Sequence, residues 1–216
     1  MAYLLNNTAD SVRIWDIDFG ENNSPYTNST YAAGSLSKNI VTDENGMQTI
    51  EYKNSFDLVV LKKVQLSNAP AAGHSGWMCT YYIYDDFYNL RYVLQPKAVD
   101  YALKNNWTLS QSVRDELCFV YQYDDQSRMI VKKVPGSGES WLVYDGRGRL
   151  VMTQDSLMRL QGKWMCTQYD DLNRPVSTLL WSNSNSRLYH QNLAATSINY
   201  PNATSNTELL TDRKSV

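Results

Sequence analysis

The sequence predicts an all-β protein of tandem antiparallel β-hairpins, with a short helical insertion. Tyrosine is abundant, with 16 residues against 4 phenylalanines, and it suits half-buried sheets where the ring packs and the hydroxyl stays wet. The dipeptide Asn45-Gly46 separates two strand-like runs, which is a strong hairpin signal. A layout of strand, polar turn and apolar strand then recurs along the chain. Together these observations favour repeated hairpins over a helical or mixed fold.

Residues 1–45 are expected to form strands and loops. Residues 12–19 alternate loosely, which predicts a strand with Arg13, Trp15, Ile17 and Phe19 on one face. At Asn45-Gly46 the expected connection is a type I′ turn, which needs positive φ at both central residues.

Five segments repeat the same layout, each with a strand that ends in tyrosine. Their tyrosines are Tyr52, Tyr84, Tyr123, Tyr144 and Tyr169. In the first segment Lys53 stands where the others have Asp, and the last three share Tyr-Asp-x-x-x-Arg. The repeat-signature residues are Tyr84, Asp85, Tyr123, Asp124, Arg128, Tyr144, Asp145, Arg149, Tyr169, Asp170 and Arg174. We expect each Asp to shape its turn by accepting backbone N–H groups. Each Arg then begins the return strand across from the Tyr-Asp pair, within reach of ring stacking and a charge-assisted hydrogen bond.

Helical spacing interrupts the repeats at about residues 96–117. Pro96 suits a first helical turn, and Val99 and Leu103 are four residues apart. Two short helices are predicted, at about 97–104 and 110–117. The stretch 182–216 is polar and weakly patterned, so it is predicted to be rich in loops.

Tandem Tyr-Asp units with a downstream Arg resemble the YD-repeat, or RHS-repeat, family. The resemblance is carried by "YDDFYNLRYVLQPKA", "YQYDDQSRMIVKKVPG", "VYDGRGRLVMTQD" and "QYDDLNRPV". It covers about residues 46–181, so the expected organisation is a β/loop region at 1–45, the hairpin array at 46–181 and the loop-rich segment at 182–216.

The resemblance implies hairpins wound into a continuous spiral sheet. In toxin-complex subunits such a sheet closes into a shell around a toxic C-terminal fragment, and teneurins use a similar barrel at the cell surface. Neither the family's self-cleaving core nor its variable effector is recognisable in this sequence. The implied partners are further repeats of a longer parent protein, of which this chain is expected to be a truncated or frame-shifted piece. A C-terminal toxin or effector, or a glycan, is the other implied partner, and the parent is expected outside the cell or in its envelope.

The composition argues against two partner classes. Lys plus Arg is 20 and Asp plus Glu is 22, which leaves a net charge of −2 and gives no electrostatic reason to expect nucleic acid. No apolar run approaches the ~20 residues of a membrane span. The first ten residues, "MAYLLNNTAD", have neither the basic nor the long apolar region of a secretory signal.

The cysteines are predicted to be core residues. Cys79, Cys118 and Cys166 form no C-x-x-C pair, and a zinc site would have to gather them with His74 or His190 from distant repeats. The segment "WMCT" occurs twice, with its Trp seven residues before Tyr84 and five before Tyr169. Both spacings are odd, so Trp and Cys share the face opposite the repeat tyrosine. A buried sheet face explains that parity better than a reactive pair of thiols.

The paired acids admit three interpretations. Asp85-Asp86, Asp124-Asp125 and Asp170-Asp171 suit turns, calcium ligation or a glycosidase pair. Turn chemistry is favoured because the pairs recur with the repeat, whereas a catalytic pair is normally unique in a fold. Neither histidine lies in a nucleophile motif, and "PGSGES" lacks the Lys of a phosphate loop. We therefore expect no catalytic residue, metal or cofactor.

Three functional hypotheses follow. The favoured one is a non-catalytic structural segment of an RHS-type shell that encloses or displays a C-terminal effector. The first alternative is a cell-surface carbohydrate-binding module that uses exposed Tyr and Trp, although Trp77, Trp141 and Trp164 are favoured as core residues. The second alternative is an enzyme whose cleft joins a non-repeated acid, Asp100 or Glu116, to the repeat acids.

Overall fold

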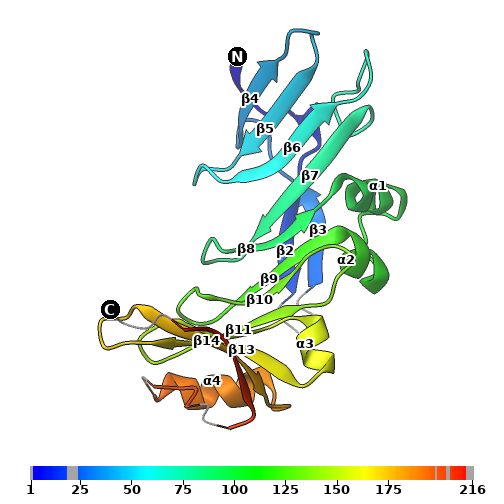
Figure 1. The fold of residues 1–216 in the computed structure, drawn as a ribbon. Coiled ribbons are helices and arrows are strands. Elements are labelled where there is room, and N and C mark those ends of the chain that lie inside the picture. The colour runs from blue at the N-terminus through cyan, green and yellow to red at the C-terminus, as the bar shows by residue number, and fades with distance from the viewer. Residues whose placement is uncertain (1, 19–23, 198, 203–204, 213–216) are drawn as a thin grey trace. The chain divides into compact units, whose positions relative to one another are not determined.

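The computed structural model describes residues 2–18, 24–197, 199–202 and 205–212. The chain divides into two compact units, residues 1–121 and 122–216 (Figure 1). Both units consist mainly of antiparallel strands joined by tight turns, so the prediction of an all-β hairpin fold with short helices is confirmed.

The first unit is built on a sheet of consecutive antiparallel strands in the order β1-β4-β5-β6-β7-β8-β9 (Figure 1). Its strands are β1 (Ala2–Leu5), β4 (Ser37–Thr42), β5 (Gln48–Lys53), β6 (Val59–Gln65), β7 (Trp77–Tyr84), β8 (Leu90–Leu94) and β9 (Cys118–Tyr123). A second sheet pairs β2 (Arg13–Asp18) with β3 (Ser24–Thr30), and β2 packs against β7. A short 3-10 helix, η1 (Thr8–Asp10), connects β1 to β2.

The two predicted helices are present between β8 and β9. Helix α1 (Pro96–Lys104) has Pro96 in its first turn and packs its buried face on β7. Helix α2 (Gln111–Leu117) begins after Ser110, whose hydroxyl accepts the N–H of Val113. Both predicted ranges are confirmed to within one residue.

The second unit continues the hairpin pattern. Its strands are β10 (Met129–Lys133), β11 (Ser140–Tyr144), β12 (Leu150–Gln154), β13 (Lys163–Tyr169), β14 (Pro175–Ser182) and β15 (Thr207–Asp212), each antiparallel to the next. Helix α3 (Ser156–Leu160) follows the N-cap Asp155. Helix α4 (Arg187–Ala195) packs on β11.

The stretch 182–216 differs from the loop-rich segment expected there, because its described residues include α4 and β15. Ser186 caps α4 by accepting the N–H of Tyr189. His190 and Ala194 lie four residues apart on its buried side. The helix has a narrow buried face, which explains why apolar periodicity did not reveal it.

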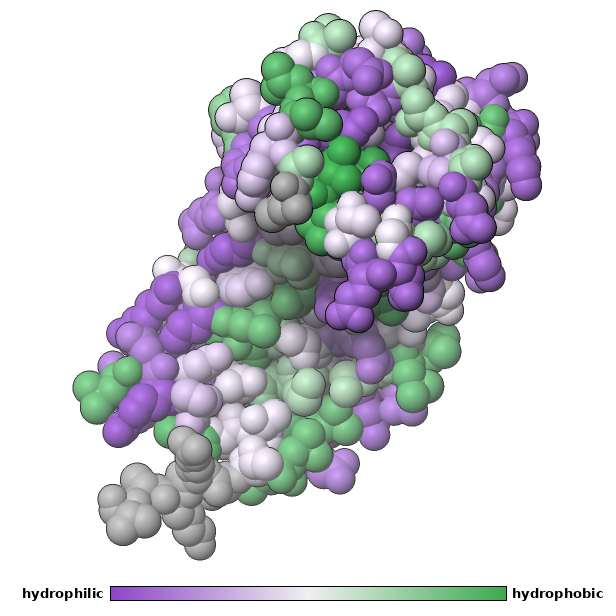
Figure 2. All heavy atoms as spheres, turned by 90° about the horizontal axis from the view of Figure 1, so that it is seen from above, coloured by the Kyte–Doolittle hydropathy of each residue, from purple (hydrophilic) through white to green (hydrophobic). Residues whose placement is uncertain are grey.

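Each unit has its own apolar core. Strand β7 shows how the sequence builds it, because Trp77, Cys79, Tyr81 and Ile83 are buried while the residues between them are not. In the second unit Trp164 and Cys166 are buried at the same alternating spacing. Polar and apolar residues are interspersed on the face that Figure 2 presents. None of the described helices is long and apolar enough to cross a membrane.

Candidate functional site

Six hairpin turns in the described part of the chain share one hydrogen-bonding pattern. Each begins with an Asp or Asn whose Oδ1 accepts the backbone N–H groups two and four residues later, at 2.9–3.1 Å. The third residue after it has positive φ and donates its N–H back to the first residue's carbonyl. The first residues are Asp43, Asn54, Asp85, Asp124, Asp145 and Asp170. All six turns therefore have the same local hydrogen-bonded structure.

Two expectations about the early turns are wrong. Gly46 has a φ of 80°, but Asn45 is not among the positive-φ residues, so the turn is headed by Asp43 and is not type I′. In the first repeat the turn residue is Asn54, so Lys53 occupies the position that tyrosine holds elsewhere. Tyr52 lies one residue earlier and is consequently fully buried on the opposite face of β5.

The arginines of the last three repeats bind the turn aspartates of their own hairpins. In each pair Nε and Nη2 both approach the Oδ2 that the turn leaves free, at 2.6–2.7 Å. The pairs are Arg128–Asp124, Arg149–Asp145 and Arg174–Asp170. In the Asp85 turn Asn89 takes the arginine's position, and Arg91, two residues later, contacts Asp85 Oδ2 at 3.4 Å.

The repeat tyrosines join successive hairpins. The guanidinium of Arg128 lies 4.8 Å from the ring centroid of Tyr144, and that of Arg149 lies 4.7 Å from the ring of Tyr169. Each arginine thus stacks on the tyrosine of the next hairpin, and the sequence had suggested only its own repeat. Such contacts contribute ~0.5–1 kcal/mol at exposed sites.

The tyrosine hydroxyls strengthen the same connection. Tyr144 donates to the carbonyl of Met129 at 2.9 Å, and Tyr169 donates to that of Leu150 at 2.8 Å. In the first unit Tyr84 donates to the carbonyl of Val59 at 3.1 Å. In all three cases the acceptor is the residue just after the end of the preceding turn. The signature therefore forms a link of acid, guanidinium and ring that runs from one hairpin to the next.

This arrangement keeps the carboxylates of Asp124 and Asp170 ionised. Burial raises the pKa of Asp124, but hydrogen bonds from the Arg128 guanidinium and from two backbone N–H groups hold it below its usual range. Backbone and guanidinium N–H groups of Arg174 likewise lower the pKa of Asp170. An acid in this state does not donate a proton near neutral pH. The described residues contain no group of three or more His, Cys, Asp or Glu placed to hold a metal ion.

The acids of the enzyme hypothesis lie on helix surfaces. Asp100 on α1 and Glu116 on α2 are both exposed. A cavity of the first unit contains the repeat acids Asp85 and Asp86, but neither helical acid lines it. The cleft that would join these acids is therefore not formed by this cavity.

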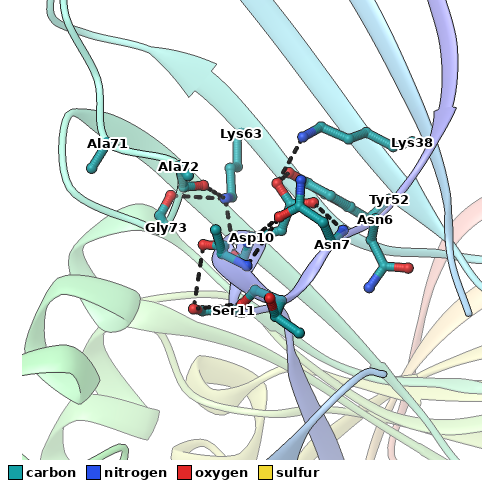
Figure 3. Close-up of polar contacts among 12 residues, drawn as sticks. Asn6, Asn7, Asp10, Ser11, Lys38, Tyr52, Lys63, Ala71, Ala72 and Gly73 are labelled. Atoms are coloured by element: carbon teal, nitrogen blue, oxygen red, sulfur yellow. Dashed lines mark hydrogen bonds and ion pairs between the residues drawn. The ribbon is translucent and has the colours of Figure 1, made fainter. Parts of the chain in front are cut away.

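A second polar cluster lies beneath the sheet of the first unit, around Asp10 (Figure 3). Asp10 is 1% exposed, and its Oδ1 accepts from Lys38 Nζ at 2.7 Å and from the Tyr52 hydroxyl at 2.8 Å. Its Oδ2 accepts the N–H of Asn7, which completes the capping box of η1. Burial alone would raise the pKa of Asp10. The contacts with Lys38, Asn7 and Tyr52 together lower it by more than burial raises it, so the pKa lies below its usual range.

Lys63 enters the same cluster from β6. Its side chain is fully buried, and Nζ donates to the carbonyls of Ala72 and Gly73 at 3.0 and 2.8 Å (Figure 3). Burial lowers the pKa of Lys63 to about 8. The cluster thus connects η1 and the loop before β7 to the sheet. The sequence did not predict it, because nothing in the spacing of Asp10, Lys38 and Lys63 marks them as partners.

All three cysteines are buried, as expected for core residues, and no disulfide joins any of them to another. Burial raises the pKa of Cys79 to about 11 and that of Cys166 to about 12. We predict that iodoacetamide modifies none of the three in the native chain near neutral pH and all three in denaturant, because the thiolate is the reactive form. Mass spectrometry of the alkylated protein measures this, and rapid native labelling of Cys79 or Cys166 would contradict the buried-face assignment.

His74 lies in the loop before β7 and is held neutral. Its Nε2 is 2.8 Å from the Tyr81 hydroxyl, and Trp107 packs against the ring. Burial first, and then the positive charges of Lys63 and Arg13, lower the pKa of His74 to about 4. His190 in α4 is fully buried among aromatic rings, and burial lowers its pKa to about 4 as well. Neither histidine is arranged as a general base beside a nucleophile.

The neutral His74 predicts acid sensitivity of the first unit. The unfolded histidine titrates near 6.5 and the folded one near 4, so between these pH values the unfolded state binds more protons. Stability is therefore expected to fall as pH drops through this window, by at most about 1.4 kcal/mol per pH unit from this group. Urea denaturation from pH 7 to 4 measures the slope, and His74→Gln is expected to reduce it. An equal slope in the variant would assign the acid sensitivity to other groups.

The aromatic side chains include both core residues and exposed ones. Trp77 and Trp164 are buried and Trp141 is half-buried, which agrees with the core assignment. The most exposed rings among the described residues are Tyr3 on β1 and Phe56, Phe87 and Tyr88 in turns.

Comparisons with known proteins show likeness in structure alone. No family model and no curated protein matches the chain. The crystal structure of TcdB2-TccC3 matches 73% of this chain with 16% identity and a TM-score of 0.50. A structure of the Photorhabdus luminescens Tc holotoxin pore matches 74% with 15% identity and a TM-score of 0.48. This chain spans 8% of the length of each. The first match supports an RHS-like fold, as the resemblance of the repeats predicts.

Proposed function

We propose that this chain is a non-catalytic structural segment of an RHS-repeat shell, which encloses or displays a C-terminal effector. The observation that carries the proposal is the link between hairpins, in which Arg149 of one hairpin covers the ring of Tyr169 in the next. Repeating that contact makes each hairpin depend on its neighbour, which is what a quasi-one-dimensional wall requires. A single hairpin is only marginally stable in water.

This function implies partners for the chain. The remaining repeats of a longer parent protein would continue the hairpin array, and the parent would act outside the cell or in its envelope. The carboxylates of Asp124, Asp145 and Asp170 are each hydrogen-bonded by their own turn and by an arginine, which supports a structural role for them.

The test uses the parent protein encoded around this chain. If the chain is part of an enclosing wall, a protease should digest the C-terminal segment of the intact parent slowly. Arg149→Ala combined with Tyr169→Ala should open the wall and speed that digestion, whereas Lys132→Ala, at an exposed position on β10, should not. Equal digestion rates in all three proteins would contradict enclosure. A hydrolase activity removed by substitution of His74, His190 or a cysteine would contradict the non-catalytic assignment.

The second candidate is binding of a glycan. The observation that favours it is the exposed pair Phe56 and Tyr88, whose ring centroids are 4.5 Å apart at an interplanar angle of 46°. Both of these rings lie in turns, whereas the sequence had suggested Tyr and Trp on a sheet face. A glycan array probed with the unsubstituted chain and with Phe56→Ala tests this candidate. It requires that the unsubstituted chain binds a glycan and that the substitution weakens this binding.

A further inference from the structure

The first unit contains a cavity of ≈ 300 Å³ beside the turns of two hairpins. It lies among β2, the β5–β6 turn and the β7–β8 turn. Its lining residues are Arg13, Trp15, Tyr31, Asn54, Phe56, Leu58, Val60, Tyr82, Ile83, Tyr84, Asp85, Asp86 and Tyr88. This volume is at the lower end for small-molecule sites, which are typically lined by aromatic and apolar side chains with few polar groups.

Arg13 is the one cation of this lining. Among the described residues its guanidinium has no carboxylate partner, and its contact is the face of Trp107, 4.8 Å from the centroid. The side chain is half-buried, so its charge is only partly solvated. A half-buried guanidinium without a counter-ion is costly, and an anion that entered the cavity would offset that cost. The indole holds the charge in position before a ligand arrives, which lowers the entropy lost on binding.

Aromatic rings contribute much of the remaining lining. Trp15 and Tyr31 come from the side of the β2–β3 ribbon, and Tyr82 comes from β7. The Tyr31 hydroxyl has no hydrogen-bond partner among the described residues, so it is free to contact a ligand. Phe56 and Tyr88, whose rings contact each other at a tilt, lie in the turns and are exposed to solvent. These walls suit the faces of a flat ring.

The two acids of the lining do not cancel the charge of Arg13. Asp85 caps its own turn and contacts Arg91, so its charge is already compensated. Asp86 is exposed, where water and salt screen it.

We propose that this cavity binds a carboxylate carried on a small ring. The planar guanidinium matches a carboxylate through two parallel N–H bonds, which a lysine or an amide does not reproduce. The ring of the ligand would pack against Trp15 and Tyr31. Two sources share this chemistry, an acidic sugar and an aryl acid, and the experiment distinguishes them.

The experiment titrates the full chain, labelled with ¹⁵N, while the indole N–H resonances are followed by NMR. The probes are glucuronate and benzoate, each with a neutral counterpart, glucose and benzyl alcohol. Trp15→Phe identifies the Trp15 resonance. At least one acid is expected to shift the Trp15 and Trp107 resonances in a saturable way, at concentrations at least tenfold below those of its neutral counterpart. Glucuronate alone would identify an acidic sugar, and benzoate alone an aryl acid.

Variants locate the carboxylate. Arg13→Gln is expected to abolish the saturable shift, and Arg13→Lys to weaken it, because lysine keeps the charge but lacks the fork. The matched control Lys132→Gln removes a positive charge from the exposed side of β10 and should bind as the unsubstituted chain does. Tyr31→Phe leaves Arg13 in place and is expected to weaken binding severalfold, which keeps the test valid if Arg13→Gln does not fold. The proposal is overturned if neither acid shifts the Trp15 resonance, if the neutral probes bind equally well, or if folded Arg13→Gln binds as the unsubstituted chain does.

Discussion

Replacing Asp10 with alanine is expected to lower the free energy of unfolding of the first unit by about 3 kcal/mol, the scale for breaking a buried ion pair. The substitution leaves Lys38 Nζ and the Tyr52 hydroxyl without their acceptor, in a place where water does not replace it. It also removes the carboxylate that accepts the N–H of Asn7 in the η1 cap. Urea denaturation read by amide hydrogen exchange in β4, β5 and β6 measures the loss.

The matched control is Asp57→Asn. Asp57 also accepts from a lysine, Lys53, at 2.9 Å, but its side chain is 83% exposed. Exposed pairs contribute ~0.2–1 kcal/mol, and asparagine tolerates the positive φ of this position. Equal losses in the two variants would show that burial of Asp10 adds nothing.

Acid provides the same perturbation without mutation. The contacts with Lys38 and Tyr52 keep the net pKa of Asp10 depressed in the folded chain. A depressed carboxyl contributes its stability above the unfolded value of about 3.9, and that contribution is lost as pH falls through the folded pKa. The difference in free energy of unfolding between the unsubstituted chain and Asp10→Ala should therefore shrink below pH 4.

Local features of the fold were predictable because they depend on neighbours in sequence. The turn aspartates act within four residues, and the cap of α2 acts within three. The burial of Cys79 and Cys166 follows from the period of a strand, which sequence displays directly. Wherever the interaction partner lay inside one hairpin or one helical turn, the residue pattern alone identified it.

Features that depend on register between hairpins were not predictable in the same way. That Arg149 covers Tyr169, twenty residues ahead, is set by the pairing of β12 with β13. Asp10 meets Lys38 and Tyr52 across 28 and 42 residues. Asn54 was missed as a turn residue for a different reason. Tyr52 precedes it by two positions, whereas in the other repeats the tyrosine directly precedes the turn aspartate. Nothing in a single sequence states which of two adjacent registers the sheet will take.

The second large effect is expected at Asp145, whose side chain is fully buried. Asp145→Ala removes the acceptor of two backbone N–H groups and leaves Arg149, 12% exposed, without its carboxylate. The expected loss in the free energy of unfolding of the second unit is about 3 kcal/mol. Because Arg149 also covers the ring of Tyr169, releasing it should loosen the next hairpin too. Hydrogen exchange in β13 measures that spread.

The repeats supply the control for Asp145, because the same contact recurs with different exposure. Asp124 and Arg128 have side chains 21% and 23% exposed, whereas Arg174, the partner of Asp170, is 69% exposed. Alanine substitutions should therefore destabilise the chain in the order Asp145, Asp124, Asp170. The turn hydrogen bonds are the same in all three, so the order is expected to follow desolvation of the ion pair and the ring contacts of Arg128 and Arg149. Asp145→Asn keeps an oxygen for the turn and loses the charge, so it should fall between the parent and Asp145→Ala. Equal losses at all three positions would mean that the turn, and not the buried link to the next hairpin, determines stability.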